Sequence, residues 1–151
     1  MAKILVIDDE RAIRNTLKEI LEFEGYHVEV AENGRVGLER ALEGAYDLIF
    51  TDIKMPEMDG LEFLHSYRKG IIQHGEEAPI VVITGHGSVD SAVDALKGGA
   101  FDFIQKPLDL NRLLVTTKHA LDHKSLVQET KVLRKKVGKR NQMIGESAAI
   151  E

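Results

Sequence analysis

Five residues with acidic, hydroxyl or amine side chains each follow an apolar run of the sequence: Asp8, Asp9, Asp52, Thr84 and Lys106. Clustered carboxylates repel one another, so they favour a bound cation, and oxygen-only ligands suit a hard ion such as Mg²⁺ that retains some waters. Once Mg²⁺ offsets the acids, Asp52 can stay ionised and attack an electrophile, while an ammonium and a hydroxyl contact the oxygens of a phosphoryl group. These residue types therefore predict the formation of an aspartyl phosphate.

Apolar runs rich in β-branched residues predict the strands that must hold these side chains. Unbroken runs, at residues 3–7, 48–50 and 79–83, are typical of strands buried on both faces of a sheet. Residues 28–30 alternate between apolar and polar side chains and predict an edge strand, and 101–105 predict the last strand. Helices are predicted between the strands, with apolar stripes that begin at Ile13, Val36, Leu61 and Val89.

Strands that alternate with helices make a parallel sheet, because crossovers of this length return each strand in the same direction. Right-handed crossovers with one reversal give a doubly wound, flavodoxin-like α/β fold of five strands in the order 2-1-3-4-5, flanked by five helices. The polar groups then share one rim of the sheet. Taken singly, Asp8, Thr84 or Lys106 could be a helix cap or a strand-end cation, but their joint placement favours a site.

Two stretches near the ends of predicted helices are less regular. The connection from Lys69 to Ala78 is long and mostly polar, and the sequence assigns it no role. Ser88 is a candidate N-cap for a helix whose apolar stripe includes Ala92, Val93 and Leu96.

The last predicted helix begins near Asp109 and meets no helix breaker until Gly138. Its expected buried stripe is Leu110, Leu113, Leu114, Thr117, Ala120 and Leu121. A single helix over 109–137 would be about 43 Å long, so its last part must project from the domain. There, a short two-helix coiled-coil seam and a frayed linker helix remain equally open; the seam positions are Leu126, Thr130, Leu133 and Val137.

Length, composition and charge limit the classes of function. The 151 residues, 43% of them hydrophobic, fit one domain with an appendage, and the chain has no cysteine. No charged-then-apolar leader and no apolar run near the ~20 residues of a membrane span is found, so we expect a cytoplasmic protein that does not bind membranes. Residues 125–151 carry six Lys or Arg and three Glu, a local +3, so the first 124 residues carry −8. An acidic body does not suit direct nucleic-acid binding.

The rim residues carry a resemblance to the receiver domains of response regulators. The matching motifs are Asp8-Asp9, Asp52 within D-I-K-M-P-E-M-D-G, Thr84-Gly85 and Lys106-Pro107, and the likeness covers residues 3 to about 122. The resemblance implies that Asp52 accepts phosphate from the phosphohistidine of a sensor histidine kinase. It also implies that Asp9, Asp52 and the backbone carbonyl of Lys54 ligate Mg²⁺, with Asp8 helping through water, and that the Lys106–Pro107 bond is cis.

The same resemblance implies a switch. The Thr84 hydroxyl would move toward the phosphoryl group, and the aromatic ring of Phe103 would turn inward and reshape the face made by the fourth helix, fifth strand and fifth helix. Phe103 as simple core filler is the alternative. Such a domain is a phosphoryl-accepting signalling domain with its own phosphotransfer and autodephosphorylation chemistry, and it is not a conventional enzyme.

The C-terminal segment Met143-Ile-Gly-Glu-Ser147 resembles the start of the AAA+ ATPase domain in NtrC-type, sigma-54-dependent activators. The resemblance implies a receiver (1–122), a helical linker (123–141) and the start of a truncated ATPase domain (142–151), with homodimerisation and with the ATPase and DNA-binding domains absent from this chain. The alternatives are a stand-alone receiver and a Mg²⁺-dependent phosphatase that uses an aspartyl phosphate. A flavin mononucleotide binder is a third, but the acidic rim would repel the cofactor's phosphate.

Overall fold

The computed structural model describes residues 2–55, 57–74, 77–85 and 89–124, and its centre is a five-stranded parallel sheet. The strand order is β2-β1-β3-β4-β5, as predicted, with each neighbouring pair parallel. The strands are β1 (Lys3–Ile7), β2 (His27–Ala31), β3 (Leu48–Asp52), β4 (Ile80–Thr84) and β5 (Asp102–Gln105). The doubly wound fold class is therefore confirmed.

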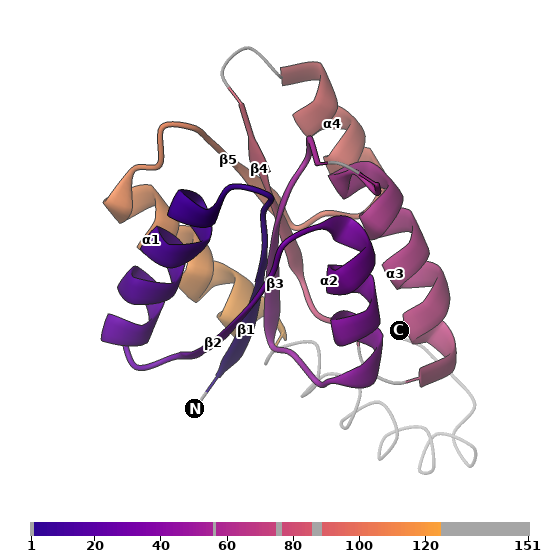
Figure 1. Ribbon diagram of the computed structural model, residues 1–151, viewed down its shortest axis with the longest axis horizontal. Coiled ribbons are helices and arrows are strands. Elements are labelled where there is room, and N and C mark those ends of the chain that lie inside the picture. The colour runs from indigo at the N-terminus through magenta and orange to yellow at the C-terminus, as the bar shows by residue number, and fades with distance from the viewer. Residues whose placement is uncertain (1, 56, 75–76, 86–88, 125–151) are drawn as a thin grey trace, which may run out of the picture.

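Helices cover both faces of this sheet (Figure 1). The helix α1 and the C-terminal helix, described over residues 110–124, lie on one face, and α2, α3 and α4 lie on the other. Their bounds are α1 (Arg11–Phe23), α2 (Gly34–Glu43), α3 (Gly60–His74) and α4 (Val89–Lys97). No helix within the described residues combines the length and the apolar character of a membrane span.

The two faces of the sheet build two separate hydrophobic clusters. All five residues of β3 and of β4 are buried, as are the last four of β1, because each of these strands has a covered face on either side. One cluster joins Leu5 and Ile49 to α2 and α3, and the other joins Ile4 and Phe50 to α1 and the C-terminal helix. A core of this size fixes the strands, and the strands fix where their polar ends emerge.

Local signals explain where the helices begin and end. The Asn33 side chain accepts a hydrogen bond from the backbone N–H of Val36 and so caps α2. Asp59 does the same for the N–H of Glu62 at the start of α3. The chain leaves α1 through Gly25, whose φ of +95° lies in the left-handed region that favours glycine.

Three expectations about packing were wrong. Helix α3 continues to His74, so the first part of the expected 69–78 connection is helical; Ile71 is buried and extends the stripe of Tyr67 by one turn. In the predicted stripe of α4, Ala92 is buried as expected, but Val93 and Leu96 are 41% and 39% exposed, because the buried face of this helix carries Ala92 and Ala95. Leu110, placed in the buried stripe of the last helix, is 52% exposed, since it lies at that helix's first turn.

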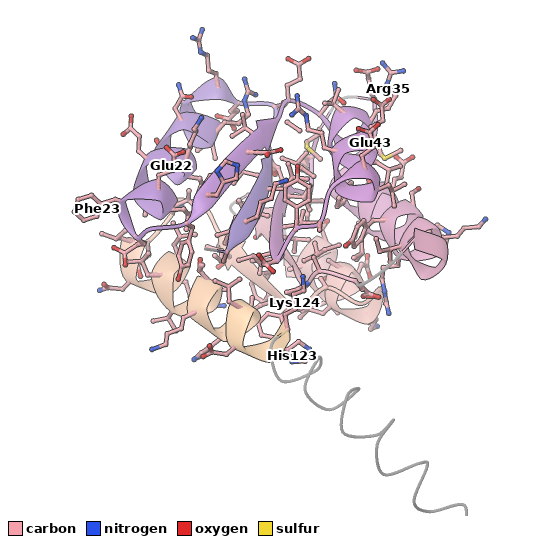
Figure 2. All side chains as sticks on the ribbon, turned by 90° about the horizontal axis from the view of Figure 1, so that it is seen from below. Glu22, Phe23, Arg35, Glu43, His123 and Lys124 are labelled. Carbon is pink, nitrogen blue, oxygen red and sulfur yellow. The ribbon has the colours of Figure 1, made fainter. Side chains whose placement is uncertain are left out.

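The C-terminal helix is anchored near the amino end of β3, at the opposite end of the strands from the polar rim. Lys124 Nζ donates to the backbone carbonyl of Tyr46 at 2.8 Å and lies 3.3 Å from Asp47 Oδ1. Figure 2 labels Lys124 at the end of this helix, beside the sheet. The candidate cap Ser88, the seam at 126–137 and the segment 143–147 lie outside the described residues.

Candidate functional site

The predicted site residues meet at the carboxyl ends of neighbouring strands. Asp8 directly follows β1, Asp52 ends β3, Thr84 ends β4, and Lys106 directly follows β5. The strand order places β1, β3, β4 and β5 side by side, and the Lys106 N–H donates to the Thr84 carbonyl at 2.8 Å. The structure therefore brings these side chains to one rim, where open α/β sheets bind their ligands.

Four carboxylates form a tight group on this rim. One oxygen each from Asp8, Asp9, Glu10 and Asp52 lies within 4.8 Å of the others. Asp8 and Asp52 are buried, whereas Asp9 and Glu10 are exposed. All the candidate ligand atoms are carboxylate oxygens, two of them on buried residues and two on residues exposed to solvent. This donor set suits a hard cation such as Mg²⁺ that keeps part of its water shell.

Lys106 places a positive charge beside these acids. Its Nζ lies 3.1 Å from Asp52 Oδ2, 3.2 Å from Glu10 Oε1 and 3.9 Å from Asp8 Oδ2. Its side chain is only 21% exposed. Although burial alone lowers the pKa of Lys106, the hydrogen bond and charge of Asp52 raise it overall, so the ammonium stays charged. The charge of this ammonium is smaller than the summed charge of the four carboxylates, so the group as a whole attracts a further cation.

Asp8 is the least compensated carboxylate of the group. Its side chain has no exposed surface, its Oδ1 accepts the N–H of Glu10 at 2.8 Å, and its Oδ2 has no hydrogen-bond partner among the described residues. Burial raises the pKa of Asp8 to about 7, and the nearby Asp52 charge adds to the rise against the hydrogen bond from Glu10. A buried oxygen without a partner is costly, and a cation with its waters would satisfy it.

Asp52 is buried but better compensated. Burial raises its pKa, and the hydrogen bond and charge of Lys106 oppose that rise. The backbone N–H of Lys54, in the loop after β3, also opposes the rise in the pKa of Asp52. Lys106 and the Lys54 backbone N–H thus favour the ionised form that a nucleophilic carboxylate needs, against the burial that keeps the pKa of Asp52 above its ordinary value.

Thr84 and Phe103 occupy the two positions predicted to switch. Thr84 is fully buried at the end of β4, and its hydroxyl oxygen has no hydrogen-bond partner among the described residues. Phe103 lies on the next strand, β5, where it is partly buried and packs against the cluster that contains Tyr67. The Lys106–Pro107 peptide bond is cis, as the resemblance implies.

Two residues that contact the site were not predicted. Glu10 shares Lys106 with Asp52, and the acidic run Asp8-Asp9-Glu10 was a signal that could have included it. Arg14 donates from Nη1 to the Asp8 backbone carbonyl at 2.7 Å, and no sequence pattern marks it. Arg14 thereby fixes the turn between β1 and α1 that carries the two aspartates.

Known proteins of the same family were found by sequence. Residues 4–118 match the family described as "Response regulator receiver domain". The transcriptional regulatory protein ZraR of Klebsiella oxytoca is 42% identical over 123 residues, which are 82% of this chain and 27% of that protein. The nitrogen assimilation regulatory protein NtrX of Azorhizobium caulinodans is 38% identical over 150 residues, 98% of this chain and 32% of that protein.

A solved structure agrees with these matches. The crystal structure of a response regulator receiver domain protein from Clostridium thermocellum superposes with a TM-score of 0.77 at 36% identity, covering 84% of this chain and 99% of that one. The chain spans about a third or less of the length of the two curated relatives. With its family match, its strand order and its acidic rim in agreement, the chain belongs to the response regulator receiver domains of two-component signalling systems.

Proposed function

We propose that this receiver accepts a phosphoryl group on Asp52 with the help of Mg²⁺. The observation that supports the proposal is the grouping of the Asp8, Asp9 and Asp52 carboxylates within 4.8 Å, with Lys106 Nζ 3.1 Å from Asp52. A structural role for these groups does not explain why several acids and an ammonium share a rim. Phosphoryl transfer requires such a set, because its transition state spreads negative charge over oxygens that need fixed cations.

The residues present fit a magnesium ion. Asp9, Asp52 and the backbone carbonyl of Lys54 would hold it, and Asp8 would contact one of its waters through Oδ2, which has no partner among the described residues. When bound, Mg²⁺ supplies a double positive charge that offsets the carboxylates and the incoming phosphoryl oxygens. Lys54 itself lies in the loop directly after β3, two residues beyond Asp52.

The chemistry belongs to the side chains of the chain itself. A carboxylate oxygen of Asp52 attacks the phosphorus of a phosphohistidine, the P–N bond breaks, and the histidine ring leaves as a neutral imidazole after taking a proton from solvent. Lys106 contacts a phosphoryl oxygen, and the Thr84 hydroxyl, which has no partner within the described part of the chain, donates to another. Water later attacks the phosphorus of the aspartyl phosphate, which releases inorganic phosphate and restores the Asp52 carboxylate.

Acetyl phosphate, a small phosphoryl donor, tests the proposal without a kinase. We expect incubation with acetyl phosphate and Mg²⁺ to add one phosphoryl group per chain, seen by intact mass and mapped to the peptide that contains Asp52. Excess EDTA should prevent the addition, and on donor removal the mass should return to its starting value. A phosphoryl group on any other residue, or one that forms equally well in EDTA, would exclude the proposal.

The partners and output follow from the relatives. We propose a sensor histidine kinase as the cytoplasmic phosphoryl donor, and an NtrC-type activator as the longer protein in which this receiver precedes an ATPase domain and a DNA-binding domain. The curated relatives are named as regulators of transcription or of nitrogen assimilation, and this chain covers only about a third of each. In this proposal the linker at 123–141 carries the signal onward.

Phosphorylation is proposed to change how two receivers associate. Reshaping of the Thr84 and Phe103 region would alter the face that carries the exposed Val93, Leu96 and Leu110. To move a population from 1:99 to 99:1, phosphate must favour the active state by roughly 5.5 kcal/mol. We expect light scattering to give a different dimer fraction when beryllofluoride and Mg²⁺ are added together. The same mass distribution with and without beryllofluoride would rule out the coupling.

A further inference from the structure

The loop between β3 and α3 begins beside the site, directly after Asp52. This loop is described at residues 53–55 and 57–59, and its first residue, Ile53, donates from its N–H to the Ile83 carbonyl at 3.1 Å. The N–H of Gly60 donates to the Ile53 carbonyl at 2.7 Å, so the two ends of the loop are joined. The orientation of the Lys54 peptide therefore depends on how the rest of this short closed loop is held.

Asn33, on the neighbouring β2–α2 turn, holds the far side of the loop. Its side chain is only 8% exposed and uses both of its polar atoms. The Oδ1 atom accepts the N–H of Val36 at 2.9 Å, and Nδ2 donates to Glu57 Oε2 at 3.0 Å. A single side chain thus caps α2 and reaches across to the loop after β3. We call the contact between Asn33 and Glu57 the amide bridge.

Two further observations show that the loop is fixed at this point. Glu57 has a φ of +67°, a left-handed conformation that costs a non-glycine residue free energy and persists only where the surroundings hold it. The start of α2 also packs so closely against the loop that a Cβ atom added to Gly34 would overlap the Met58 carbonyl oxygen. Helix α2 and the loop therefore meet without room for adjustment.

We propose that Asn33 is a positioning residue for Mg²⁺ binding, because the amide bridge fixes the loop whose Lys54 peptide faces the site. This inference rests on the proposed function, since it assumes that the Lys54 carbonyl is a metal ligand. Removal of the bridge leaves every carboxylate in place but takes away one of the contacts that hold the loop in its conformation. The Lys54 N–H and carbonyl belong to the loop, so their orientation toward Asp52 and the ion becomes less defined.

Two substitutions break the bridge from opposite sides. Asn33→Ser keeps a hydroxyl that caps α2 but is too short to reach Glu57, and Glu57→Ala leaves the Asn33 cap intact. Partners beyond the direct ligands change metal affinity by about 10–100-fold in well-studied sites. For this more distant bridge we expect each variant to weaken Mg²⁺ binding by roughly three- to tenfold, measured by titration calorimetry on the whole chain.

The kinetic signature separates positioning from general damage. The Mg²⁺ concentration for half-maximal phosphorylation by acetyl phosphate should rise by the same factor, while the rate at saturating Mg²⁺ changes little. Because both substitutions remove one contact, the double variant Asn33→Ser/Glu57→Ala should be no worse than either single variant. Unfolding by urea in EDTA, where the ion plays no part, reports the loss of fold stability separately.

A rescue variant and a control complete the experiment. Asn33→Asp/Glu57→Gln exchanges donor and acceptor, so the new carboxylate can still cap α2 and accept from the new amide, with the net charge unchanged. We expect it to restore most of the Mg²⁺ affinity. Arg35→Gln removes the ion pair between Arg35 and Glu57, whose charged atoms lie 3.6 Å apart. The Arg35 side chain is 65% exposed and points outward from α2 (Figure 2), so this variant should bind Mg²⁺ as the wild type does.

The outcomes distinguish this inference from the proposed function. If wild-type protein takes no phosphoryl group on Asp52, the proposed function is wrong. If the wild type is phosphorylated with Mg²⁺ and the two bridge-breaking variants keep its Mg²⁺ half-saturation, Asn33 is only a helix cap and the inference fails. Weakened binding that the exchanged pair does not recover would also overturn it.

Discussion

Asp52→Asn is expected to abolish phosphorylation by acetyl phosphate, with a rate lowered by at least about two orders of magnitude. The asparagine amide keeps the size of the side chain, but it has an NH2 group in place of one oxygen and lacks the anionic oxygen that attacks phosphorus. Lys106 loses its 3.1 Å partner, yet Glu10 at 3.2 Å still holds the ammonium near the rim. The measurement is the intact mass after incubation with acetyl phosphate and Mg²⁺.

Asp47→Asn is the matched control for this experiment. Asp47 directly precedes β3, the strand that ends at Asp52, so it lies at the opposite end of that strand from the rim. Its Oδ2 accepts a hydrogen bond from the Lys3 backbone N–H and its Oδ1 accepts one from Lys124. An asparagine oxygen can keep the first, and Lys124 still donates to the Tyr46 carbonyl at 2.8 Å. We expect Asp47→Asn to take up one phosphoryl group. Equal labelling of Asp52→Asn and the wild type would assign the phosphoryl group to another residue.

The position of the site was predictable because it depends on topology and not on packing detail. Buried parallel strands appear in the sequence as unbroken apolar runs, and each run here ends in the polar residue that emerges at the rim, such as Asp52 and Thr84. Once right-handed crossovers fix the strand order, convergence of these ends follows. The structure confirms the strand order and the convergence of the strand ends, and neither of these predictions required knowledge of the loop geometry.

Contacts between loops could not be predicted in the same way. The amide bridge joins Asn33 to Glu57, residues that are 24 positions apart in the sequence, and nothing in either segment indicates that they meet. Asn33 could be read as a helix cap, which it is, but its second hydrogen bond depends on how closely α2 approaches the loop after β3. That approach is set by Gly34 against Met58, a contact visible only in three dimensions.

Periodicity also failed to separate buried from exposed apolar residues. The predicted stripe of α4 included Ala92, Val93 and Leu96, but of these three only Ala92 is buried, and the second buried alanine is Ala95. Leu110 shares the spacing of the buried Leu113 but lies in the first turn of its helix. Spacing predicts which residues share a helix face, while the neighbouring element decides how much of that face is covered.

Asp8→Asn is expected to stabilise the protein against unfolding by about 1–3 kcal/mol at pH 7.5 in EDTA. The wild-type carboxylate is buried beside Asp52, and one of its oxygens has no hydrogen-bond partner among the described residues. Burial raises its pKa from 3.8 to about 7, which corresponds to at most about 4 kcal/mol. Penetration of water into the open side of the rim lowers that value. Asparagine carries no charge, and its oxygen still accepts the Glu10 N–H.

The sign of the pH dependence follows from the same shift. Because the folded protein holds the Asp8 proton more tightly than the unfolded chain, the contribution of Asp8 to wild-type stability falls as pH rises from about 4 to about 7. The advantage of Asp8→Asn should therefore be small at pH 4 and complete above pH 7. Urea unfolding of both proteins across this range measures the difference, and Glu39→Gln, which removes an exposed charge on α2, should change stability by less than about 0.5 kcal/mol.

Magnesium should reverse the order of stability of the wild type and Asp8→Asn. An ion that binds only the folded state stabilises it by RT ln(1 + [Mg²⁺]/Kd), so the wild type gains stability as Mg²⁺ is added. Asp8→Asn has lost the charge that contacts the ion through water, so its Kd is larger and its gain is smaller. The buried Asp8 charge that destabilises the folded protein without Mg²⁺ is thus the same charge that favours binding of the cation. An Asp8→Asn protein that is less stable than the wild type in EDTA, or that gains as much from Mg²⁺, would show that Asp8 has a structural role alone.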